Sequence, residues 1–171
     1  SSMAKPATRY AAVARGRVDV PGGLLSLSMP VSGTVASVDV HEGDHVHRDE
    51  ILARLDSVPA QTSLDMARAH LKQALAQQKL LDVQWKSARA RSQRLHAAAV
   101  AGAGDGASAD AAAADVDNLA VQQQAAAAAS DVVRSAVTAA EYALSRDTLR
   151  APVDADVVAV HTQIGASVSE Q

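Results

Sequence analysis

The 171-residue chain contains no cysteine and no phenylalanine, and aromatic residues make up only 2% of it. Without cysteine, disulfides and thiolate metal sites are excluded. Large aromatic side chains supply much of the buried area of compact cores, so their scarcity argues against a thick globular interior. Alanine is the commonest apolar residue. Because alanine packs in thin seams between helices, we expect an elongated shape.

Long apolar runs and strong charge are also missing. No stretch of about 18 apolar residues is present, so no membrane-spanning helix is predicted. The net charge of −3 without a basic stripe argues against nucleic-acid binding. Ser1-Ser2-Met3 has no charged start and apolar stretch of a signal peptide, and we interpret it as a cloning scar. We expect the chain to be a piece of a longer protein.

One short β-type segment occurs twice, first at residues 29–46 and again at residues 151–168. A constant offset of 122 residues aligns two prolines, four pairs of valines and two turn glycines. These pairs are Pro30 and Pro152, Val31 and Val153, Val35 and Val157, Val38 and Val160, Gly43 and Gly165, and Val46 and Val168. Such duplication predicts two equivalent halves of one small β-domain.

Alternation with period two predicts strands at residues 24–29, 35–40 and 51–55. Residues 1–23 are ambiguous, although they contain a flanking strand pattern and a Pro-Gly-Gly turn signal. Residues 51–56 have no counterpart in the second copy, which stops at Gln171. We therefore divide the β-type sequence into an N-terminal segment 1–23, a first half 24–56 and a second half 149–171 that is truncated.

Residues 57–148 predict two long helices. Ser57 offers an N-cap with Pro59 in the first turn, and no glycine or further proline follows before Gly102. The second helix is expected from about Ser108 to Asp147. Each helix carries a heptad seam of small and apolar residues with a few polar lapses. The seams are Leu64, Ala67, Leu71, Ala74, Gln78, Leu81, Trp85, Ala88, Ser92 and Leu95, and Val116, Leu119, Gln123, Ala126, Ser130, Val133, Val137, Ala140 and Leu144.

The two predicted helices have nearly equal lengths, roughly 65 and 60 Å at 1.5 Å per residue. A short glycine-rich loop at residues 102–107 joins them. Equal lengths and a short connection predict an antiparallel hairpin with its tip at this loop.

Residues 29–35 with Glu42-Gly43-Asp44 resemble the first half of a lipoyl-type domain, and residues 148–154 resemble the second half. A lipoyl-like domain split by a helical hairpin is characteristic of periplasmic adaptor, or membrane fusion, proteins of tripartite efflux pumps and HlyD-type secretion systems. The resemblance covers about residues 24–171. It implies an α+β fold, in which a long antiparallel α-helical coiled-coil hairpin interrupts a split lipoyl-like β-sandwich.

The resemblance also implies a function without catalysis or cofactor. The protein would be a periplasmic linker, anchored to or associated with the inner membrane in its full-length form. It would join an inner-membrane transporter of the RND, ABC or MFS type, through parts outside this chain, to a TolC-like outer-membrane channel. The family further implies a homo-oligomer, a hexamer by resemblance. The exported cargo is not encoded in any recognisable motif.

The hairpin tip is the partner-binding site that the resemblance implies. A tip signature of the family is Arg, then Leu four residues later, then Ser seven beyond the Leu. Arg91 and Leu95 match the first two places, and the third falls on Gly102. Ser108 is the next serine at a helix start. These four residues are our candidate tip contacts; the alternative for Arg91 and Leu95 is a solvated face and an ordinary seam position.

Histidines give the one hint of metal chemistry. His41, His45 and His47 lie within seven residues, and two of them share one face of a predicted strand. Such a group could chelate zinc, but no further ligand is fixed by spacing. We favour a solvent-facing polar loop. No nucleophile motif, Walker loop or dinucleotide fingerprint appears, so no enzyme is predicted.

Two other functions compete with an adaptor. A lipoyl or biotinyl carrier would display a modifiable lysine on the turn between its halves. Here the whole hairpin replaces that turn, and no lysine follows Lys86. A structural coiled-coil spacer would leave the duplicated β-segments unexplained. The second half also has Ala155 where the first has Gly33; if Gly33 has a positive φ, alanine there costs about 1 kcal/mol.

Overall fold

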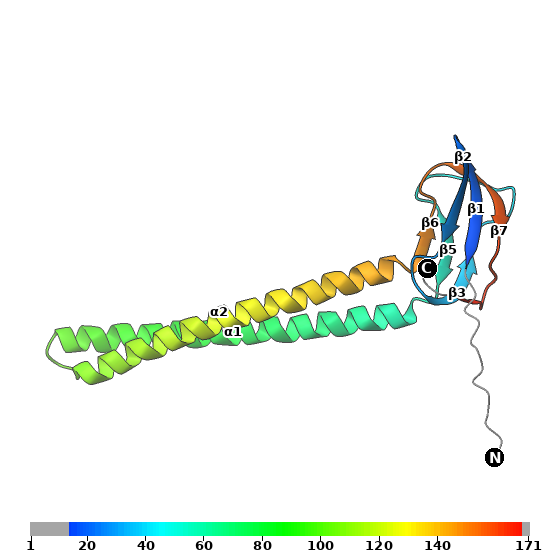
Figure 1. Cartoon of the computed structure of the whole chain (residues 1–171). Coiled ribbons are helices and arrows are strands. Elements are labelled where there is room, and N and C mark those ends of the chain that lie inside the picture. The colour runs from blue at the N-terminus through cyan, green and yellow to red at the C-terminus, as the bar shows by residue number, and fades with distance from the viewer. Residues whose placement is uncertain (1–13, 169–171) are drawn as a thin grey trace, which may run out of the picture. The chain divides into compact units, whose positions relative to one another are not determined.

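The computed structural model describes residues 14–168. The chain divides into two compact units, a β-domain within residues 1–62 and 141–171, and a helical unit of residues 63–140 (Figure 1). The scar interpreted at residues 1–3 and the chain end at Gln171 lie outside the described residues. None of the helices in residues 14–168 combines the length and apolar character needed to cross a membrane.

The β-domain contains two four-stranded antiparallel sheets. The first has the order β2-β1-β7-β4, made of Gly23–Ser28, Arg15–Val20, Ala155–Val160 and His45–Val46. The second has the order β6-β5-β3-β8, made of Thr148–Arg150, Ile51–Leu55, Gly33–Val38 and Ser167–Val168. Strands from both copies of the repeat therefore occur in each sheet.

The two copies exchange their short strands. In the β3–β8 pair Gly33 faces Val168, and in the β7–β4 pair the equivalent residues Ala155 and Val46 face each other. The turn glycines behave alike, since Gly43 and Gly165 have φ values of 93° and 83°. Their N–H groups donate to carbonyls of the opposite copy at 2.7 and 2.8 Å. Neither half completes its own sheet, which confirms the split sandwich.

Strand β1 supplies the counterpart that residues 51–56 lack in the sequence. Gly16, Arg17 and Val18 of β1 face Val160, Ala159 and Val157 of β7, just as Ala53, Arg54 and Leu55 of β5 face Val38, Ser37 and Val35 of β3. Within the segment that the sequence left ambiguous, residues 15–20 and Gly23 therefore belong to the first sheet. The two sheets are equivalent, with β1 and β2 in the places of β5 and β6.

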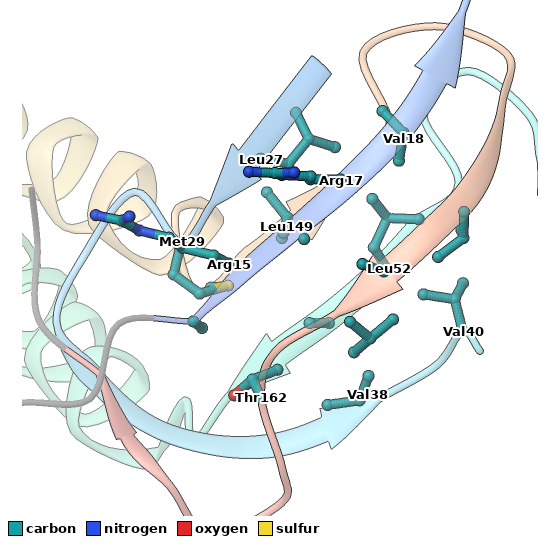
Figure 2. A pocket seen from close by; sticks show the side chains of 16 residues that line it. Arg15, Arg17, Val18, Leu27, Met29, Val38, Val40, Leu52, Leu149 and Thr162 are labelled. Carbon is teal, nitrogen blue, oxygen red and sulfur yellow. The ribbon is translucent and has the colours of Figure 1, made fainter. Parts of the chain in front are cut away.

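The core between the sheets is built from small aliphatic side chains. Val46 and Val35 are 0% and 1% exposed and lie in two separate clusters. A cavity of about 40 Å³ lies along the inner side chains (Figure 2), among them Val38, Val40 and Leu52. Because ligand pockets measure about 300–1,000 Å³, this space is a packing gap.

Gly33 does not have the left-handed backbone that would penalise alanine at the equivalent position. It is absent from the positive-φ glycines of residues 14–168. A Cβ added to it would lie 2.9 Å from Cδ1 of Leu55 on the neighbouring strand. The condition of a positive φ is therefore not met, and a larger residue at this position would require the end of the Leu55 side chain to shift. At the equivalent place in β7, Ala155 is buried and accommodated.

The hairpin consists of α1 (Val58–Val100) and α2 (Gly106–Ser145). Every predicted seam residue is buried or half-buried, as the heptad spacing requires. Two polar residues of the seam form a hydrogen bond with each other. The hydroxyl of Ser130, which is 2% exposed, donates to Oε1 of Gln78 at 2.8 Å. The antiparallel coiled-coil hairpin is thereby confirmed.

Candidate functional site at the hairpin tip

A glycine in the left-handed region ends α1. Gly102 has φ of 75°; its N–H donates to the carbonyl of Ala99 at 3.1 Å, and the N–H of Ala103 donates to Ala98 at 2.9 Å. This pair of bonds is a Schellman motif, which satisfies the last carbonyls of the helix. The serine of the family signature would be strained at this position, since residues with a Cβ rarely adopt such a φ.

An aspartate caps α2. Asp105 Oδ1 accepts a hydrogen bond from the N–H of Ala107 at 3.0 Å, and Oδ2 accepts one from the Ser108 hydroxyl at 2.9 Å. The hydrogen bond from Ser108, followed by that from the Ala107 N–H, lowers the pKa of Asp105. The cap starts the helix at Gly106, two residues before the predicted start. Sequence reasoning missed Asp105 because its flanking glycines suggested a flexible turn.

The four predicted tip residues have different surroundings. Arg91 is exposed on α1, and Leu95, one turn further, is half-buried at its seam position. Gly102 and Ser108 lie on either side of the loop, as the cap of α1 and in the first turn of α2. The Ser108 hydroxyl donates a hydrogen bond to the Asp105 carboxylate. The neighbouring Val100 is 76% exposed, an apolar side chain that sequence reasoning did not select.

Gly104 packs the loop onto the end of α1. A Cβ there would lie 2.9 Å from the Ala99 backbone nitrogen and 3.1 Å from Ala98. We expect Gly104→Ala to destabilise the hairpin by about 1–3 kcal/mol, the usual cost of overpacking, as measured by thermal unfolding. Gly106→Ala is the matched control, because no atom lies within 4 Å of its added Cβ. Equal effects of the two substitutions would contradict a tightly packed tip.

The two helices near the tip carry opposite charges. Residues 83–104 contain basic but no acidic side chains, and residues 105–130 contain acidic but no basic ones. The basic residues are Lys86, Arg89, Arg91 and Arg94, and the acidic ones are Asp105, Asp110, Asp115 and Asp117. Lys86 pairs with Asp82 of its own helix, and Arg89 lies over the Trp85 ring. Within residues 14–168 no salt bridge joins the two rows.

The histidine turn links the two halves of the β-domain. His45 of β4 lies directly opposite Asp156 of β7, and its Nδ1 is 2.7 Å from Asp156 Oδ1. His47 Nδ1 lies 3.9 Å from Asp154 Oδ1. His41 contacts Asp44 within its own turn. Across the described part of the chain, no three histidine, aspartate or glutamate side chains are grouped to hold a metal ion.

Protonation of His45 is coupled to the pairing of the halves. The hydrogen bond to Asp156 raises the pKa of His45 above its ordinary 6.5, and the charges of Asp156, Asp154 and Glu50 add to this against partial desolvation. A raised folded-state pKa gives stability that is fully present below the ordinary pKa and is lost as pH rises through the raised one. Asp156 also faces Asp19 of β1, so the imidazolium offsets a cross-strand repulsion.

We therefore expect the melting temperature of the β-domain to fall as pH rises from about 6 to 8. The fall should be smaller in His45→Gln and in Asp156→Asn, because each removes the proton-linked contact. His70→Gln, on an exposed position of α1, is the control and should keep the wild-type pH profile. If His45→Gln kept the wild-type pH profile, the contact between His45 and Asp156 would not contribute to the pH dependence of the melting temperature.

Comparisons with known proteins agree with this architecture. The chain superposes on MacA from Actinobacillus actinomycetemcomitans with a TM-score of 0.78 and 22% identity, over 92% of this chain and 48% of that one. On the membrane fusion protein Spr0693 from Streptococcus pneumoniae R6 the TM-score is 0.56 with 19% identity, over 94% and 62% of the two chains. At these identities the likeness concerns the fold alone.

A curated relative matches part of the sequence. The UPF0194 membrane protein YE2891 of Yersinia enterocolitica is 39% identical over 66 residues. This match spans 39% of the present chain and 20% of that protein. The chain thus spans less than two thirds of the length of each of these three proteins.

A sandwich of two interlocked halves, interrupted by a capped helical hairpin, defines a membrane fusion or periplasmic adaptor protein. Residues 25–171 match the family profile described as "RND MFP, barrel-sandwich hybrid domain". The chain belongs to this family.

Proposed function

We propose that this chain is the docking part of a periplasmic adaptor that links an inner-membrane transporter to a TolC-like outer-membrane channel. Export across the Gram-negative envelope would be its purpose. Membership of the membrane fusion family supports this proposal, because adaptors of efflux and secretion systems work with transporters and outer-membrane channels. The full-length protein would be periplasmic and held at the inner membrane, and it would contact an RND, ABC or MFS transporter through parts outside this chain.

The observation that carries the proposal is the construction of the tip. Both helices end in satisfied caps, at Gly102 and at Asp105, and Gly104 packs the loop onto α1. A pre-ordered loop loses little conformational entropy on docking. In this proposal Arg91 supplies charge, Leu95 and Val100 supply apolar contact, and Gly102 and Ser108 fix the shape that the channel meets.

Assembly without chemistry is the proposed mode of action. Copies of the adaptor would pack with the basic row of one hairpin against the acidic row of the next, and the family resemblance suggests six copies. The opposite charges of residues 83–104 and 105–130, which form no salt bridge with each other within residues 14–168, support contacts of this kind. They would steer association and weaken it at high salt.

Two alternatives receive less support. A lipoyl or biotinyl carrier needs a lysine on the connecting turn, and residues 87–171 contain none. A spacer made only of coiled coil has no need of two halves that exchange β4 and β8. An adaptor uses both features.

Site-directed crosslinking tests the proposal, and residues 1–171 bring no native cysteine to it. A cysteine at Val100 in the full-length protein should crosslink to a TolC-like channel from the same genome. Arg91→Glu should reduce the yield without changing thermal stability, because Arg91 is exposed and makes no ion pair within residues 14–168. A cysteine at Leu24, 61% exposed in the β-domain, is the control. Crosslinks from position 24 and none from position 100 would refute tip docking.

A further inference from the structure

The outer face of β1 and β2 carries a basic groove. Arg15 and Arg17 of β1 are exposed, whereas Val18 between the sheets is buried. Directly opposite the two arginines on β2 lie the exposed serines Ser28 and Ser26. Figure 2 shows both arginine side chains on the same side of β1. Residues 15–18 of β1 also line the small apolar cavity between the sheets, together with Val38, Val40 and Leu52.

The segment that follows β7 contributes the imidazole of His161 to this groove. The backbone N–H of His161, just after β7, donates to the carbonyl of Arg15 at 2.9 Å. His161 lines the groove with the two arginines and the two serines. The groove has a volume of about 530 Å³, and none of the residues that line it is acidic.

Within residues 14–168, neither arginine of the groove has a counter-ion, unlike Arg54 and Arg134. Arg54 pairs with Asp39 at 3.4 Å, and Arg134 pairs with Asp131 at 3.0 Å. In the described range 14–168, neither Arg15 nor Arg17 takes part in a salt bridge. The chain has a net charge of −3, whereas these two neighbouring guanidinium groups form a local patch of positive charge. Alone they repel each other, and an anion between them would remove the repulsion.

We propose that this groove binds a phosphate-type oxyanion. Each planar guanidinium can donate two parallel hydrogen bonds to phosphate oxygens, a geometry that lysine does not offer. The hydroxyls of Ser26 and Ser28 lie across the strand pair as further donors. The same chemistry is met in free phosphate compounds and in the phosphodiester headgroups of anionic lipids. The site is separate from the hairpin tip, so the proposal does not depend on docking to a channel.

Titration with inorganic phosphate, followed by calorimetry, tests the small-ligand source. Sedimentation with phosphatidylcholine vesicles, with and without phosphatidylglycerol, tests the lipid source. In Arg15→Gln and in Arg17→Gln the dissociation constant should rise about tenfold, because a charge-assisted bidentate contact is lost. Arg54→Gln removes the same charge from the other sheet and should leave binding unchanged.

Each outcome has a defined meaning. Binding to phosphate, to phosphatidylglycerol vesicles or to both, with loss in the two groove variants, supports the site and identifies its source. Absence of binding to either probe overturns the proposal. So does an Arg54→Gln effect as large as those of the groove variants, since this would reveal attraction by overall charge alone. Ser26→Ala should weaken binding less than Arg17→Gln, which separates hydroxyl donation from charge.

Discussion

Val157→Asp is expected to destabilise the β-domain strongly. Val157 is 4% exposed on the central strand β7 and belongs to the core cluster with Val46 and Leu52. An aspartate there would bury a carboxylate with no partner, at a cost of about 4 kcal/mol. Because small domains are stable by only about 5–15 kcal/mol, this cost removes a large share of the stability of the β-domain. A strong fall in its melting temperature, followed by the strand signal in circular dichroism, would record the loss.

Val158→Asp is the matched control for this substitution. Val158 is the next residue of β7 and is 46% exposed, so its carboxylate would remain in water. We expect this variant to fold with a melting temperature close to that of the wild type. Similar destabilisation by both variants would contradict the inward and outward alternation of β7 on which the sandwich is built.

Leu81→Ala is expected to weaken the hairpin by about 2–4 kcal/mol. The seam mixes leucines with alanine and other smaller side chains, and Leu64 and Leu81 are the two buried residues of α1. Leu81 is 5% exposed, and its truncation would leave a cavity that neighbouring small side chains cannot fill. Helix content during thermal or urea unfolding measures the loss.

The neighbouring leucine provides the control. Leu80 is 50% exposed, so Leu80→Ala should change the free energy of unfolding by no more than about 0.5 kcal/mol. A hairpin that tolerates Leu81→Ala equally well would not be held by its seam. The heptad interpretation of α1 would then be wrong, and the stability of the β-domain would not affect this conclusion.

Local patterns predicted the elements of this protein well. The offset of 122 residues relates β3, residues 33–38, to β7, residues 155–160, and it relates β4 to β8 in the same way. The heptad spacing placed every seam residue at a buried or half-buried position. Both signals depend on residues close to one another in the chain, where periodicity reports directly which face is buried.

The candidate tip was only partly predictable. Its loop was located within two residues, because glycine marks a helix end. The cap formed by Asp105 and Ser108 was not recognised, since an aspartate between two glycines equally fits an irregular turn. The reason for Gly33 was also missed: its close neighbour Leu55 lies on another strand, and no local pattern shows which strands become neighbours.

By itself the amino-acid order determined which segments are equivalent, which form long helices and which side chains line the helical seam. Tertiary structure alone decided that β1 replaces the missing counterpart of β5, that the two copies exchange β4 and β8, and that His45 meets Asp156, 111 residues away. The physical reason is the range of the interactions. Helix and strand formation follow from neighbouring residues, whereas partner choice depends on which strand edges and charges remain unpaired once the whole chain has folded.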